Sequence, residues 1–161
     1  MLAAREGVQL ATADAEEIVD AMRSLPPHAD VVPALRVLRD AGYSLCTLTN
    51  SPLEVVEDQL SRAKLSHHFD AVLSADQVKA LKPRHEPYAL VARTFDVALA
   101  NVWLVAAHHW DVAGALAAGC AAAFVARPGM HLSRFERPDI VGDDLIAVAR
   151  RLSARAHLHA G

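Results

Sequence analysis

Residues 101–129, NVWLVAAHHWDVAGALAAGCAAAFVARPG, decide the fold because they form one strand, loop, helix and strand unit. Residues 102–106 are an apolar run that suits a strand buried on both faces, and residues 121–126 are a second such run. Between them, residues 113–119 are small and apolar and close on a glycine, which is typical of a helix end. Two buried strands joined through a helix predict a parallel sheet.

The rest of the chain shows the same alternation of helix and strand patterns. Apolar residues at helical spacing predict further helices at residues 14–25, 31–42, 53–63, 88–95 and 143–152. Short apolar runs predict further strands at residues 43–48, 69–73 and 139–141. The predicted fold class is therefore α/β, with a parallel sheet covered by helices on both faces.

Composition limits the classes of function. The chain has 161 residues, of which 53% are hydrophobic and 22% charged, so it can build the core of one domain. A net charge of -3 without any run of Lys or Arg predicts neither a nucleic-acid nor a membrane partner, which leaves small molecules. Cys46 and Cys120 lie in or beside apolar runs, so we expect two buried, reduced thiols and a cytoplasmic protein.

Polar residues follow three of the predicted strands or the connections after them. They are Thr49 with Asn50, then Lys82, and then Asp111. Because the carboxyl ends of parallel strands share one edge of a sheet, we expect these side chains to meet in one crevice. Each also has a plain structural interpretation: Thr49 and Asn50 as turn residues, Lys82 as a surface lysine and Asp111 as the N-cap of a helix. His108, His109 and Trp110, before Asp111, can likewise be ordinary loop residues.

The order of these motifs resembles the haloacid dehalogenase superfamily, specifically the type II (S)-2-haloacid dehalogenases. LTNSP at 48–52 is similar to the second motif of that family, LKPRHEPY at 81–88 to the third and LVAAHHWDVAGALAAGC at 104–120 to the fourth. The resemblance covers roughly residues 30–150. It implies a Rossmann-like core in which an aspartate carboxylate displaces halide from C2 of a small haloacid, forming an ester that water hydrolyses.

The resemblance also implies a role for each site residue. Thr49 and Asn50 would bind the substrate carboxylate, Lys82 would stabilise the charge of the nucleophile, and Asp111 would place the hydrolytic water. The pocket and its water shell would include Tyr88, His108 and Trp110. No metal ion or other cofactor is implied.

Three features depart from the family pattern. Ala106 and His108 stand where serine and asparagine are common in the family. The larger departure is the first motif, a strand ending in Asp and followed closely by Gly-Thr, because no such strand precedes residue 43. Asp14, Asp20 and Asp30 all lie in helical or proline-flanked settings. We therefore expect a truncated chain without its nucleophile, inactive as it stands.

The resemblance predicts where the missing strand would lie and how the chain divides. That strand would run in the middle of the sheet, between the strands at 43–48 and 102–106. Residues 1–27 would be the remnant of a helical cap, 28–156 the Rossmann-like core and 157–161 a loose tail.

Two other functions stay open. A magnesium phosphatase of the same superfamily needs several carboxylates around the cation, whereas this corner offers Asp111 alone. A catalytically dead core could instead act as an interaction module, and exposed strand edges would then favour self-association, including a homodimer.

Overall fold

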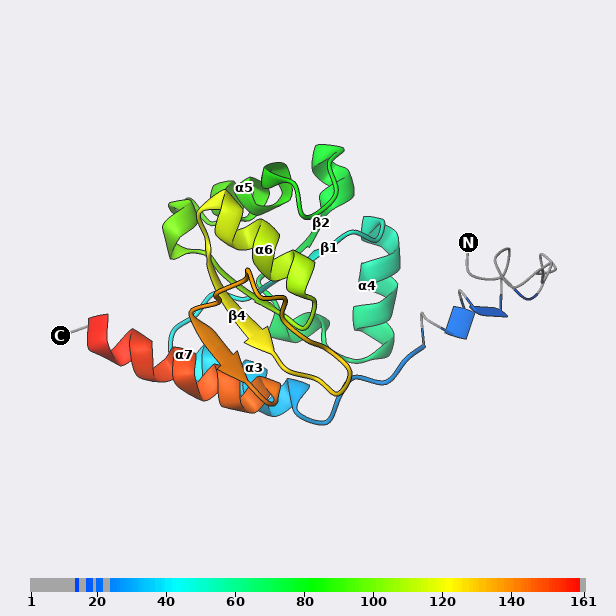
Figure 1. Cartoon of the computed structure of the whole chain (residues 1–161). Helices are drawn as coiled ribbons and strands as arrows, with labels where there is room; N and C mark the ends of the chain where they lie inside the picture. The colour runs from blue at the N-terminus through cyan, green and yellow to red at the C-terminus, as the bar shows by residue number, and fades with distance from the viewer. Residues whose placement is uncertain (1–13, 15–16, 19, 22–23, 160–161) are drawn as a thin grey trace.

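The computed structural model of the chain describes residues 14, 17–18, 20–21 and 24–159 (Figure 1). Its helices are α3 (Val31–Asp40), α4 (Leu53–Arg62), α5 (His85–Thr94), α6 (His109–Ala118) and α7 (Leu145–His159). Its strands are β1 (Cys46–Thr49), β2 (Ala71–Ser74), β3 (Trp103–Ala106), β4 (Ala121–Val125) and β5 (Ile140–Gly142). Short 3-10 turns are η1 (Ser66–His68), η2 (Ala75–Val78) and η3 (Leu99–Asn101). The predicted α/β fold class is confirmed.

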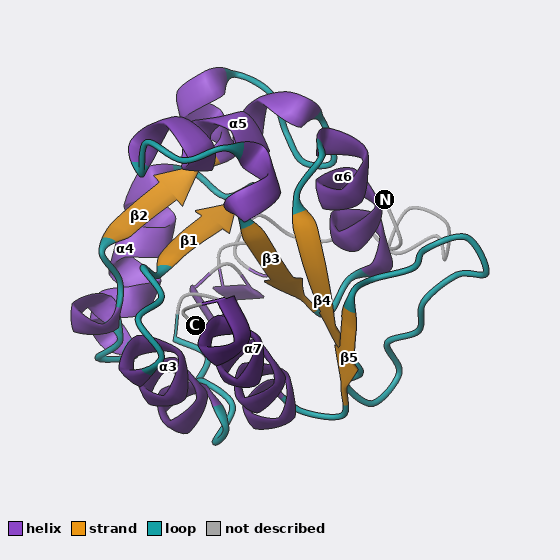
Figure 2. Ribbon diagram, turned by 90° about the vertical axis from the view of Figure 1, so that its left-hand side faces the viewer, coloured by secondary structure: helices purple, strands orange, loops and turns teal. Residues whose placement is uncertain are grey.

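All described strand pairs are parallel, but they form two sheets. β1 pairs with β2, and β3 pairs with β4, which in turn pairs with β5. β1 and β3 are neighbours in space without pairing, so one edge of each sheet faces the other (Figure 2). This is the place where the sequence analysis put the missing strand.

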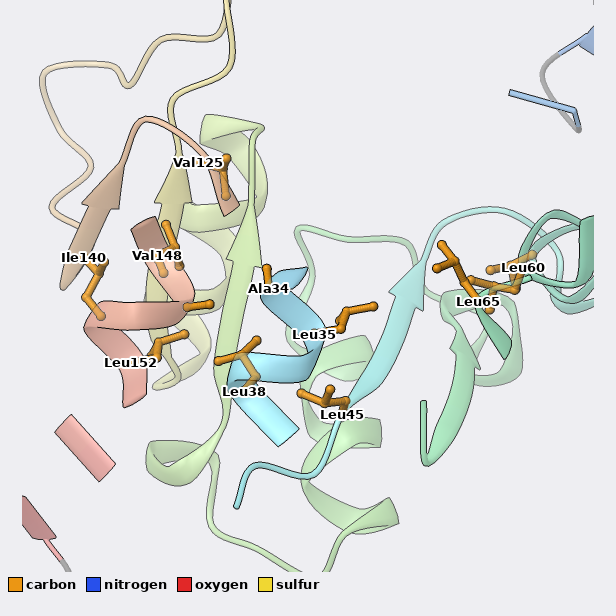
Figure 3. Close-up of a cluster of buried hydrophobic side chains, with 13 residues drawn as sticks. Ala34, Leu35, Leu38, Leu45, Leu60, Leu65, Val125, Ile140, Val148 and Leu152 are labelled. Atoms are coloured by element: carbon orange, nitrogen blue, oxygen red, sulfur yellow. The ribbon is translucent and has the colours of Figure 1, made fainter. Parts of the chain in front are cut away.

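Helices cover both faces of the larger sheet, and the pattern of β4 shows why. Ala123 and Val125 belong to a core cluster with α3 and α7, whereas Ala122 and Phe124 belong to a second cluster with α5 and α6. Successive side chains of a strand point to opposite faces, so an unbroken apolar strand requires a cover on each side. Figure 3 shows the first cluster, with residues of α3, α7 and β5 among its members.

Two predicted helix boundaries need correction. The helix after β3 begins at His109 rather than at residue 113, because His108 already accepts the backbone N–H groups of Asp111 and Val112. The last helix continues to His159, so residues 157–159 are helical and not a loose tail; residues 160–161 lie outside the described part. Residues 153–159 contain no glycine or proline and are rich in helix formers, which lets the helix run on beyond the buried Leu152.

The first predicted helix falls largely outside the described residues. Residues 14, 17–18 and 20–21 are helical, but Met22, on which the predicted spacing depended, is not among those described.

Candidate functional site

The candidate site lies at the carboxyl ends of β1 and β3. Thr49 ends β1 and Asn50 follows it, while Asp111 sits in the first turn of α6, after β3. Lys82 comes from the segment between η2 and α5. Lys82 thus contacts residues that are 29 to 34 positions away in the sequence, at the edge of the sheets where parallel strands end.

Asn50 holds the backbone of Lys82 from both sides. The amide N–H of Lys82 donates to Asn50 Oδ1 at 2.8 Å, and Asn50 Nδ2 donates to the Lys82 carbonyl at 3.2 Å. Both backbone hydrogen-bonding groups of Lys82 are therefore committed to one side chain. This fixes the position from which the lysine side chain enters the site.

The ammonium of Lys82 is buried and paired. It donates to the carbonyl of Leu48 at 2.8 Å and to Asp111 Oδ2 at 3.1 Å, and the two charged side chains are only 8% and 7% exposed. An ion pair taken out of water has to recover a large desolvation cost, and fold stability alone is weak grounds for keeping one. Such a pair in a cavity is typical of a functional site.

Asp111 has one carboxylate oxygen still available. Its Oδ1 is buried and has no hydrogen-bond partner among the described residues, although Oδ2 bonds Lys82. A buried acceptor without a partner costs free energy, so a donor from a ligand or water is expected there. The N-cap of α6 is His108 and not Asp111. The interpretation of Asp111 as a helix cap was therefore wrong.

Tyr88 supports this arrangement from α5. It is 1% exposed, and its hydroxyl donates to the backbone carbonyl of Asp111 at 3.2 Å. Burial, and then the charge of Asp111, raise the pKa of the phenol, so Tyr88 stays a protonated donor. It lines the cavity described below but acts on the backbone of Asp111 rather than on its carboxylate.

His108 and Trp110 lie at the exposed rim of the site. The Trp110 ring centroid is 5.9 Å from Lys82 Nζ, within the range of a cation–π contact, and 5.5 Å from the His108 ring. Thr49 Oγ1 accepts the backbone N–H of Ser51 at 3.1 Å, which is the turn role that the sequence allowed. The structure thus brings all seven predicted site residues to one edge, while their chemical roles stay predictions.

A cavity of about 540 Å³ opens from this edge and runs between the two sheets. One wall is residues 45–48, in and before β1, and the other is residues 103–106, in β3. Lys82, Tyr88 and Asp111 lie on its lining, and further lining residues come from α3, α5 and α7. The cavity therefore links the charged edge to an apolar interior.

Cys46 and Thr47 are notable within this lining. Thr47 Oγ1 is buried without a hydrogen-bond partner in the described part of the chain. Burial, and to a lesser extent the charge of Asp70, raise the pKa of the Cys46 thiol to about 11. Both Cys46 and Cys120 are free thiols; Cys120 is buried, as predicted, whereas Cys46 is only partly buried.

Ser74, the last residue of β2, was not among the predicted site residues. Ser74 is fully buried, and its hydroxyl donates to the carbonyl of Ser51 at 2.6 Å and accepts the N–H of Asp76 at 3.1 Å. The side-chain oxygen of Gln77 accepts the Ser74 backbone N–H, which completes a capping box. The signal was present as Ser-x-x-Gln after an apolar run. The hydrogen bond from the Ser74 hydroxyl to the Ser51 carbonyl ties the end of β2 to the turn after Asn50.

No metal cluster emerges from the part of the chain that the structure describes: it holds no group of three or more His, Cys, Asp or Glu side chains able to share a cation. The same residues include no helix long and apolar enough to cross a bilayer.

A family model for haloacid dehalogenase-like hydrolases matches residues 8–125. Haloacetate dehalogenase H-2 of Moraxella sp. (strain B) is 30% identical over 116 residues, which are 71% of this chain and 52% of that protein. (S)-2-haloacid dehalogenase H-109 of Pseudomonas putida is 30% identical over 105 residues, 65% of this chain and 47% of that one. The chain thus spans about half the length of these curated relatives.

Solved structures agree with these matches. The L-2-haloacid dehalogenase of Xanthobacter autotrophicus, solved with chloropropionic acid covalently bound, superposes with a TM-score of 0.82 at 25% identity. The alignment covers 92% of this chain and 70% of that one.

Proposed function

The chain belongs to the haloacid dehalogenase-like hydrolase family, and from that premise we propose that its site serves the hydrolytic dehalogenation of small (S)-2-haloacids. We further propose that the 161-residue chain alone does not turn over, because the attacking carboxylate must come from outside the residues that form this site. The observation that carries the proposal is the buried pair of Lys82 and Asp111 with one free carboxylate oxygen.

The reaction needs two carboxylates with different tasks. In the first step a carboxylate oxygen bonds to C2 of the substrate, the carbon–halogen bond breaks, and halide leaves with the electron pair. In the second step water attacks the carbonyl carbon of the ester, and its protons pass to the released 2-hydroxy acid and to the surrounding bases. Inversion at C2 occurs in the first step only, so the product has the opposite configuration.

The geometry supports the division of tasks given by the resemblance. Lys82 Nζ, already close to Asp111 Oδ2, offers a fixed positive charge for an incoming carboxylate. Asp111 Oδ1 is the buried acceptor that a hydrolytic water needs. Thr49 and Asn50, at the end of β1, would receive the carboxylate of the substrate.

Asp111 itself is a poor candidate for the nucleophile. Its Oδ2 is held by the Lys82 ammonium, and its side chain is almost fully buried. Asp30 is equally committed, because it pairs with Arg127 and accepts the N–H of Leu145 at the start of α7. A carboxylate entering from the cavity between β1 and β3 would reach the site without breaking either pair.

We also propose the division of the chain into a cap remnant (1–27) and a catalytic core (28–156), in a cytosolic protein whose cysteines remain reduced. The runner-up function is a phosphatase of the same superfamily, which would require a divalent cation beside Asp111. A non-catalytic interaction module is the third candidate, favoured only by the unpaired edges of β1, β2, β3 and β5 among the described strands.

Halide release from (S)-2-chloropropionate tests the proposal. Three proteins are compared: the 161-residue chain, the chain extended at its amino terminus by a strand ending in Asp, and the same extension ending in Asn. We expect release only from the Asp extension, none from (R)-2-chloropropionate, and loss of release in the Asp extension carrying Asp111→Asn. Steady release by the 161-residue chain that Asp111→Asn abolishes would refute the assignment of roles.

A further inference from the structure

The larger sheet ends at β5 (Ile140–Gly142), which is its outer strand. Among the described strands β5 pairs with β4 alone, so its other edge has no strand partner (Figure 2). Val141, the middle residue of β5, is 39% exposed, whereas Ile140 and Gly142 are buried. An edge strand with an exposed apolar residue is a surface on which a strand of another molecule can pair.

The backbone groups of Val141 face this outer edge. The carbonyl of Gly142 accepts the N–H of Ala126, which follows β4, so Gly142 directs its backbone groups toward β4. Successive residues of a strand direct their hydrogen-bonding groups to opposite edges. The N–H and C=O groups of Val141 therefore point away from β4.

Arg151 of α7 already binds the outward carbonyl. Its Nη1 donates to the Val141 oxygen at 2.6 Å, which is a short, charge-assisted hydrogen bond. The ladder between β4 and β5 does not use that oxygen, because the ladder lies at the opposite edge of β5. The Arg151 bond thus occupies the acceptor that a further strand of this sheet would need.

A second copy of β5 is the partner whose pairing this bond opposes. Two copies related by a twofold axis pair antiparallel, and a register centred on Val141 places that residue opposite itself. Because the backbone groups of Val141 face outward, the two copies would exchange both N–H···O=C bonds there, so each copy needs its Val141 carbonyl.

Acidic residues at both ends of β5 also argue for a second copy as the partner. In the register centred on Val141, Asp139 of one copy stands opposite Asp143 of the other, and like charges directly opposite each other destabilise a strand pair. The same two carboxylates would attract a basic peptide. The charges are therefore directed against self-pairing, as is the Arg151 bond.

We propose that the outer edge of β5 is a pairing surface for a second copy of this chain, and that Arg151 blocks it by occupying the Val141 carbonyl. Loss of that bond frees the acceptor, and the three-stranded sheets of two copies can then continue into each other. The inference is independent of the proposed function, because the candidate site lies at the carboxyl ends of β1 and β3.

The test compares variants of the full 161-residue chain by sedimentation velocity over a range of concentrations. Arg151→Met removes the donor and keeps an apolar stem at this exposed position. Arg150→Met is the matched control, because it removes the same charge from the neighbouring exposed position of α7. The double variant Arg151→Met/Val141→Lys places two lysines opposite each other at the centre of the pair.

We expect Arg151→Met to dimerise more tightly than the parent. Two charge-assisted bonds, one in each copy, must break before the parent can pair, so the dissociation constant of the dimer should fall by at least about tenfold in Arg151→Met. Arg150→Met and the double variant should behave like the parent. Amide exchange measured by NMR should slow at Val141 as the concentration of Arg151→Met rises, with Gly142, which faces β4, as the internal reference.

Four results would overturn the proposal. The first is an Arg151→Met chain that associates no more than the parent, and the second is equal association of Arg150→Met. The third is association that persists in the double variant or leaves exchange at Val141 unchanged, since the interface would then lie elsewhere. The fourth is a parent chain that is already dimeric with a protected Val141 amide, because Arg151 would then not block the edge.

Discussion

Substituting Gly114 by alanine sets two physical effects of opposite sign against each other. Gly114 is buried inside α6, where alanine is favoured over glycine by about 1 kcal/mol through helix propensity. However, a Cβ at this position would overlap the Tyr88 hydroxyl and would lie 2.6 Å from Pro83 Cβ and 2.8 Å from Pro83 Cα. Pro83 Cα is backbone and cannot rotate away, so either α6 or the Lys82–Pro83 segment must move.

The overlap should outweigh the propensity. Overpacking a buried site costs about 1 to 3 kcal/mol, and displacement of the Tyr88 hydroxyl also weakens its hydrogen bond to Asp111, a further cost of about 1 kcal/mol. We expect Gly114→Ala to lower the free energy of unfolding by about 1 to 3 kcal/mol after the propensity gain is included. Urea denaturation followed by circular dichroism measures this change.

Ala117→Gly is the matched control, because Ala117 is exposed on the same helix. Its expected loss of about 1 kcal/mol reports propensity alone. Adding Tyr88→Phe to Gly114→Ala should recover part of the loss, since it removes one overlapping atom. A Gly114→Ala chain that is as stable as the parent, or more so, would refute the close packing of α6 against Pro83 and Tyr88.

Two further predictions concern charged groups. Lys82→Met leaves the buried Asp111 carboxylate without its cation and should cost about 3 to 5 kcal/mol in urea denaturation; the double variant Lys82→Met/Asp111→Leu should lose less, and an equal or larger loss would contradict the pairing. Asp30→Asn should lower the free energy of unfolding by about 1.5 to 3 kcal/mol at neutral pH, because Asp30 accepts a charge-assisted bond from Arg127 and a bond from Leu145. The Arg127 bond chiefly lowers the pKa of Asp30 in the folded chain, so this stability is complete above the unfolded pKa of about 3.9 and disappears as pH falls through the lower folded value. Unfolding measured from pH 7 to pH 2 should show the two chains converge, and a constant difference would show that ionisation of Asp30 is not involved.

The meeting of Lys82 with Asp111 could be predicted from sequence because parallel topology alone brings strand ends together. No knowledge of side-chain packing was needed, only the order of strands and the polar residues after them. The position of the gap between β1 and β3 was instead predicted from the resemblance, since the missing motif in the family pattern belongs to a central strand.

The contacts that position the site could not be predicted in the same way. The two bonds between Asn50 and the Lys82 backbone span 32 residues, and no periodicity links those positions. The early start of α6 was also hidden, because His109 and Trp110 are weak helix formers, and the pattern therefore placed the helix start at the alanines. The start of α6 is instead decided by the His108 carbonyl, which accepts the backbone N–H groups of Asp111 and Val112.

The ammonium of Lys82 also sets a dimension of the molecule. It lies 2.8 Å from the carbonyl of Leu48, in one sheet, and 3.1 Å from the carboxylate of Asp111, at the start of the helix that follows the other sheet. One nitrogen atom thus bridges the carboxyl ends of the two sheets and limits how far apart they can stand. Arginine would keep the charge but carry a larger, planar head group, so the two acceptors would have to move apart to receive it. The spacing of the two sheets and the charge of the candidate site therefore depend on the same side chain.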